Sequence, residues 1–141
     1  MRARTAAVAA ALLAAGGLAP SVCAQESQAD RCAVSIGRGA TGLGGAAGTM
    51  TVRNVGRPCR IVNFTVPEQR VATSRLEVVR APAQGRLEVI QPNLVAYTPN
   101  PGYTGPDEFR YGGSGPGREG RTLSFGVRIQ VRVVGPDASV R

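Results

Sequence analysis

The sequence contains no histidine, no tryptophan and no lysine, so all 17 of its basic residues are arginine. The absence of histidine removes the usual general base and the commonest ligand of transition metals. Without lysine, the chain has no Walker A lysine, no Schiff-base chemistry and no Ser-Lys dyad. We therefore do not expect an enzyme, and we expect neither a metal ion nor another cofactor.

Acidic residues are few as well, and they are scattered along the chain. Asp and Glu total 9, which leaves a formal net charge of +8 at pH 7. Glu77 and Glu88 lie near arginines in strand-like runs, so cross-strand ion pairs explain them better than a catalytic carboxylate pair. The surplus of arginine would attract polyanions, but an ordinary solvated arginine surface, or a GC-rich genome, is the simpler explanation.

The N-terminal segment, residues 1–24, has the pattern of a secretory signal peptide. Two arginines precede an uncharged run rich in Ala and Leu, and small residues occupy the third and first positions before a cut after Ala24. The uncharged run is too short to anchor the chain in a bilayer. Lipidation at Cys23 is disfavoured because the preceding residue, Val22, is not small enough for that signal. We expect a cleaved protein in the periplasm or outside the cell, with no stable membrane insertion.

Cysteine is rare, with three residues in the whole chain. Removal of the signal peptide leaves two of them, Cys32 and Cys59. Cysteines in small exported domains usually pair because the compartment is oxidising. Their wide separation and the lack of a C-x-x-C motif favour a structural disulfide over a redox pair or two buried thiols.

Regular alternation in the last part of the chain gives the clearest structural signal. From Leu123 to Val133, apolar residues occupy one face of the predicted strand, and Ser, Gly, Arg and Gln occupy the other. This period of two is typical of a half-buried antiparallel strand. Similar but shorter runs come before it. The predicted strands cover residues 32–36, 49–55, 59–66, 76–79, 86–90, 93–98, 108–111 and 123–133.

Turns rich in Gly, Pro and Asn separate these runs, and no segment has helical periodicity. We predict an all-β fold of about seven short antiparallel strands, arranged as a sandwich or barrel. Residues 25–31 and 136–141 are expected to be tails around one domain, residues 32–135. Of the two glycine-rich stretches, residues 37–48 are expected to be a flexible loop or an irregular edge, and residues 112–120 a loop. The G-x-G-x-x-G match in the first of them is accidental, because no helix can follow it.

A longer pattern covers the C-terminal half. Residues 82–87 read P-A-Q-G-R-L, and residues 95–111 read V-A-Y-T-P-N-P-G-Y-T-G-P-D-E-F-R-Y. Together with the final strand, residues 82–134 resemble a bacterial Ig-like or cadherin-like repeat domain. The resemblance implies an Ig-like Greek-key β-sandwich of the kind found in exported adhesins and surface proteins. It covers less than half of the mature chain and leaves out both cysteines.

The resemblance also bears on individual residues. Tyr97, Phe109 and Tyr111 would face the core, and Asp107 would brace a neighbouring loop. Some members of the family bind calcium between repeats through several acidic residues. Here only Asp107 matches, Glu108 lies beside it and no second repeat is present, so calcium is not expected.

The leading hypothesis is therefore a noncatalytic Ig-like module with a structural or protein-interaction role in the bacterial envelope or outside the cell. The alternative is a binder of anionic envelope polysaccharide through Arg128 and Arg132 on the last strand. A small hydrolase built on the scattered acids is the weakest candidate. The expected partner is an envelope protein or an anionic polysaccharide. Nucleic acid is not expected, because the protein is exported and no aromatic residues interleave with the arginines. We expect a monomer.

Overall fold

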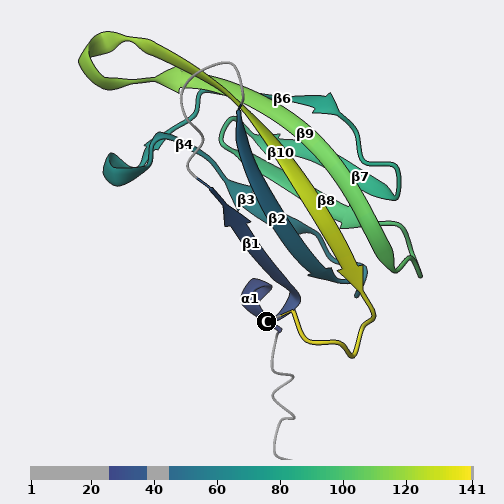
Figure 1. The fold of residues 1–141 in the computed structure, drawn as a ribbon. Coiled ribbons are helices and arrows are strands. Elements are labelled where there is room, and N and C mark those ends of the chain that lie inside the picture. The colour runs from purple at the N-terminus through teal and green to yellow at the C-terminus, as the bar shows by residue number, and fades with distance from the viewer. Residues whose placement is uncertain (1–25, 38–44, 141) are drawn as a thin grey trace, which may run out of the picture.

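The computed structural model describes residues 26–37 and 45–140 (Figure 1). The predicted signal peptide and its cleavage site lie outside this part of the chain. The described residues form ten strands, one short helix and two single 3-10 turns. The helix is α1 (Gln28–Arg31), and the 3-10 turns cover Pro67–Gln69 and Arg118–Gly120. The strands are β1 (Cys32–Ile36), β2 (Ala46–Arg53), β3 (Cys59–Val62), β4 (Phe64–Val66), β5 (Val71–Ala72), β6 (Arg75–Arg80), β7 (Gly85–Gln91), β8 (Leu94–Pro99), β9 (Gly105–Pro116) and β10 (Thr122–Val134).

Two sheets pack face to face and enclose the core. One has five strands in the order β1-β2-β10-β9-β6, and the other has three strands in the order β3-β8-β7. The short strands β4 and β5 pair only with each other. The prediction of an all-β fold is confirmed. The details differ from the expectation, because there are more strands than about seven and because β2 pairs with β10 in parallel.

The core lies between the two sheets and is filled as the alternation predicted. On β10, Val127, Ile129, Val131 and Val133 are buried, while the arginines between them face outward. The rings of Tyr97 on β8 and Phe109 on β9 stack with their centroids 5.4 Å apart. Because these rings come from opposite sheets, their contact holds the sandwich together at its centre.

A disulfide joins the two sheets at one edge. Cys32 begins β1 and Cys59 begins β3, and their Cα atoms are 6.0 Å apart. Both side chains are buried. The predicted disulfide is therefore confirmed. It links β1, at the edge of the five-stranded sheet, to β3 of the three-stranded sheet.

The hairpin of β9 and β10 is longer than expected, because residues 112–116 continue β9 where a loop was predicted. It extends past the other strands at the upper left of Figure 1. Glycine is required here for packing. A Cβ atom on Gly113 would lie 2.6 Å from the Leu76 side chain and 2.7 Å from the Phe125 ring. Because Gly113 has no side chain, Leu76 and Phe125 can pack directly against its backbone.

The predicted strand 59–66 is divided into β3 and β4 at Asn63, which is buried. The Asn63 amide donates to the Ile61 carbonyl at 3.0 Å, and its oxygen accepts from the Tyr111 hydroxyl at 2.8 Å. Burial raises the pKa of Tyr111, so the hydroxyl stays protonated and donates. The buried side chain of Asn63 is therefore hydrogen-bonded through both its nitrogen and its oxygen at the point where the strand breaks.

Both segments predicted as tails contact the domain. The side chain of Gln28 in α1 donates to the Arg60 carbonyl at 2.8 Å and accepts from the Arg60 amide at 3.2 Å. Near the other end, Val140 is buried. In the described part of the chain, no helix has the length and apolar character needed to cross a membrane.

Candidate functional site

The outer face of the five-stranded sheet carries a row of three arginines. The strand register places Arg128 of β10 directly opposite Arg110 of β9, and Arg110 directly opposite Arg80 of β6. Arg132 lies on the same face of β10, four residues after Arg128. We call these four residues, together with Glu108, the arginine face. Like charges placed directly opposite each other destabilise a sheet, so this arrangement needs an explanation.

Arg80 reaches this face because of a β-bulge. Val78 pairs with Tyr111 and Arg80 with the adjacent Arg110, so Val79 is the extra residue on β6. In a regular strand, residues two apart point to the same face. Without the bulge, Arg80 would therefore point to the same face as Val78 and its partner Tyr111, which is the face toward the core. Bulges commonly redirect a side chain in this way. The extra residue therefore completes the arginine row.

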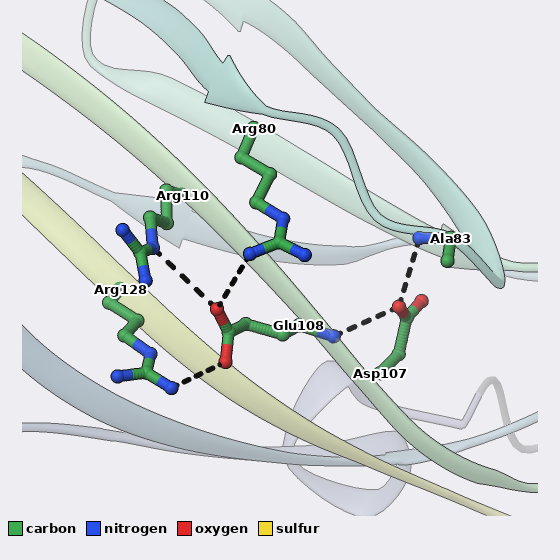
Figure 2. Close-up of polar contacts among 6 residues, drawn as sticks. All are labelled: Arg80, Ala83, Asp107, Glu108, Arg110 and Arg128. Carbon is green, nitrogen blue, oxygen red and sulfur yellow. Dashed lines mark hydrogen bonds and ion pairs between the residues drawn. The ribbon is translucent and has the colours of Figure 1, made fainter.

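Glu108 is the carboxylate on which the three arginines converge, as Figure 2 shows. Its oxygens lie 2.8 Å from Arg128, 3.6 Å from Arg110 and 3.7 Å from Arg80. The hydrogen bond from Arg128 lowers the pKa of Glu108, and the charges of the three arginines lower it further, while partial desolvation opposes them. Glu108 is thus held ionised and partly neutralises the row.

This geometry predicts the titration of Glu108. Its carboxyl pKa should lie below the usual value of 4.5, and Arg128→Gln should raise it toward that value. The stability that ionised Glu108 contributes should be present above about pH 4.5 and lost as the pH falls through its lower folded-state pKa. Carboxyl-detected NMR titration of the wild type and the variant measures both values. Identical pKa values in the two proteins would show that the contact does not exist in solution.

A shallow groove of about 780 Å³ runs beside the row. Its lining extends from Arg80 and the loop after β6 to the outward threonines of β2, Thr49 and Thr51. Glu108 on β9 and Gln130 and Arg132 on β10 lie between them. The groove therefore combines guanidinium groups with neutral hydroxyl and amide groups.

Asp107 lies next to Glu108 and points away from the arginines, toward the loop between β6 and β7 (Figure 2). Its Oδ1 accepts from the backbone amides of Ala83 at 3.1 Å and Glu108 at 2.9 Å. Its Oδ2 accepts from the amide of Gln84 at 3.1 Å and the hydroxyl of Tyr97 at 2.8 Å. Burial, and then this hydrogen bond, raise the pKa of Tyr97, so the hydroxyl donates. Asp107 thereby fixes the loop that borders the groove.

The structure brings the candidate arginines to one surface but gives them different partners. Arg128 is paired with Glu108, whereas Arg132 forms no ion pair with any residue that the structure describes. The sequence reasoning missed Glu108, Arg110 and Arg80 as part of the site. The outward position of Glu108 and Arg110 could have been read from their alternation with Phe109 and Tyr111. Arg80 could not, because its orientation depends on the bulge.

Metal ligands do not gather in the described residues, where no group of three or more His, Cys, Asp and Glu side chains could hold an ion. The oxygens of Asp107, the residue for which the resemblance raised calcium, accept four hydrogen bonds from protein donors. The chemistry that this surface offers is the binding of anionic groups by guanidinium.

No protein-family model matches the sequence, and no curated protein matches it significantly.

Proposed function

We propose that this chain is a noncatalytic, exported Ig-like module with a structural or protein-interaction role in the bacterial envelope or outside the cell. The observation that carries the proposal is the sandwich of two sheets joined by the Cys32–Cys59 disulfide. Disulfides persist in oxidising compartments such as the periplasm and the extracellular space, which supports export. The residue pattern of 82–134 supports the Ig-like class.

The strand order gives further support to an Ig-like relationship. In immunoglobulin-type domains, strands B, E and D form part of one sheet, and C, F and G form the other. The orders β3-β8-β7 and β6-β9-β10 follow this scheme. The N-terminal strands depart from the constant-type arrangement, because β2 pairs with β10 and not with β3. Such sandwiches serve many functions, so the fold alone does not identify the partner. The partner depends on the side chains at the outer surface.

Intact-mass analysis of the protein recovered from its native host tests the proposal. We expect a chain that begins at Gln25, contains one disulfide and is found in the periplasmic or extracellular fraction. Crosslinking in whole cells should then join it to an envelope component. An unprocessed chain with free thiols in the cytosol would contradict the proposal.

A further inference from the structure

We propose that the groove beside the arginine face binds a carboxylated polysaccharide, with Arg80 and Arg132 as the ligand-contacting cations and Glu108 as an internal counter-ion. This inference rests on the proposed role as an envelope interaction module and names the chemistry of its partner. It assigns the site to the five-stranded sheet.

The first argument is the charge balance of the surface. Four guanidinium groups, those of Arg80, Arg110, Arg128 and Arg132, share the face with one carboxylate. The side chains of Arg80, Arg110 and Arg128 are 65%, 46% and 48% exposed. Exposed ion pairs contribute little to stability. The face therefore keeps a large positive surplus that folding does not require, and an anionic ligand would neutralise it.

The second argument is that β6 carries a bulge that adds to the repulsion. If β6 were regular, Val79 and not Arg80 would lie opposite Arg110. Only Arg110 and Arg128 would then be adjacent on this face, and the repulsion between like charges would be smaller. The bulge instead directs the Arg80 side chain outward, where it borders the groove. Redirection of a side chain toward a site is a common role of bulges.

The third argument concerns the kind of anion. The groove walls place the hydroxyls of Thr49 and Thr51 and the amides of Gln84 and Gln130 among the arginines. These neutral groups both donate and accept hydrogen bonds, which matches the hydroxyls of a sugar ring. Arginine binds carboxylate in a bidentate way. The open groove crosses several strands, so it suits an extended acidic glycan better than a single small anion.

Glu108 has a specific role in this arrangement. It holds Arg128 at 2.8 Å and lies farther from Arg110 and Arg80, at 3.6 and 3.7 Å. The carboxylate orders the guanidinium groups while it repels an incoming anion. Removal of its charge should therefore strengthen binding, which an ordinary stabilising ion pair would not predict.

Titration calorimetry with polygalacturonate as the probe tests the site, using the full chain as its host processes it. At low ionic strength, Arg80→Gln and Arg132→Gln should each weaken binding about tenfold, the size of one lost charge-assisted hydrogen bond. Glu108→Gln should strengthen binding about threefold. Added salt should weaken binding of the wild type. Melting curves of each variant verify that it remains folded.

Arg86→Gln is the matched control, because Arg86 lies on β7 of the other sheet, is 69% exposed and is paired with Glu88. It should leave affinity unchanged, and neutral dextran should not bind. Equal losses with Arg86→Gln and Arg80→Gln would overturn the assignment to this face. Weaker binding by folded Glu108→Gln would overturn the counter-ion role. Poly-glutamate binding as tightly as polygalacturonate would overturn the polysaccharide identity.

The outcome is separable from the test of the proposed function. Absence of polygalacturonate binding overturns the groove assignment, even if the chain is processed, oxidised and crosslinked to an envelope protein. A reduced, unprocessed cytosolic chain overturns the proposed function, whatever the purified protein binds.

Discussion

Replacement of both disulfide cysteines, Cys32→Ala with Cys59→Ala, should lower the free energy of unfolding by about 3–4 kcal/mol. The bond closes a loop over a sequence separation of 27 residues, so its loss enlarges the conformational freedom of the unfolded chain. It also links β1 to the sheet that contains β3. Urea denaturation of the wild type and the double variant, followed by circular dichroism, measures the difference.

The wild type with reductant is the control for this experiment, since it should approach the stability of the double variant. Both forms should retain β-sheet circular dichroism below the transition, because the aromatic core between the sheets does not depend on the bond. A difference of less than about 1 kcal/mol would mean that the bond contributes far less than its loop length implies.

Asp107→Ala should destabilise the domain by about 3 kcal/mol. The substitution leaves the amides of Ala83, Gln84 and Glu108 and the hydroxyl of Tyr97 without their acceptor. Since Tyr97 is fully buried, its hydroxyl finds no easy replacement in water. The loop between β6 and β7 should become more mobile, which hydrogen exchange at Ala83 and Gln84 measures.

Asp107→Asn gives the informative comparison, because it keeps the shape and one acceptor oxygen. Its cost should be smaller, about 1–2 kcal/mol, with partial protection of the loop amides. Glu88→Ala, on an exposed part of β7, should change stability little. Equal effects of Asp107→Ala and Glu88→Ala would contradict the role of Asp107 in fixing the loop.

The parts of the structure that the sequence predicted are those encoded by local patterns. The alternation of apolar and polar residues in β10 predicted which face of the strand is buried, because successive side chains of a strand point to opposite faces. The pairing of Cys32 with Cys59 followed from counting cysteines after an expected cleavage. The inward positions of Phe109 and Tyr111 followed from the pattern of the C-terminal half.

The parts that were missed depend on contacts between distant segments. The glycine-rich run 112–115 resembles a loop in the sequence, but it forms a strand because β10 and β6 pair with it on both sides. The parallel pairing of β2 with β10 has no local signal. The convergence of Arg80, Arg110 and Arg128 on Glu108 requires the register of three strands and the bulge at Val79, neither of which composition or periodicity reveals.

The claim that the outer face of the five-stranded sheet is the interaction surface is tested most directly by NMR of the arginine side chains. Polygalacturonate should be added while the Nε–Hε signals are followed. We predict that Arg80, Arg110, Arg128 and Arg132 shift, whereas Arg60 and Arg86 on the three-stranded sheet do not. Shifts that begin at Arg60 and Arg86, with the four arginines of the arginine face unchanged, would contradict the account.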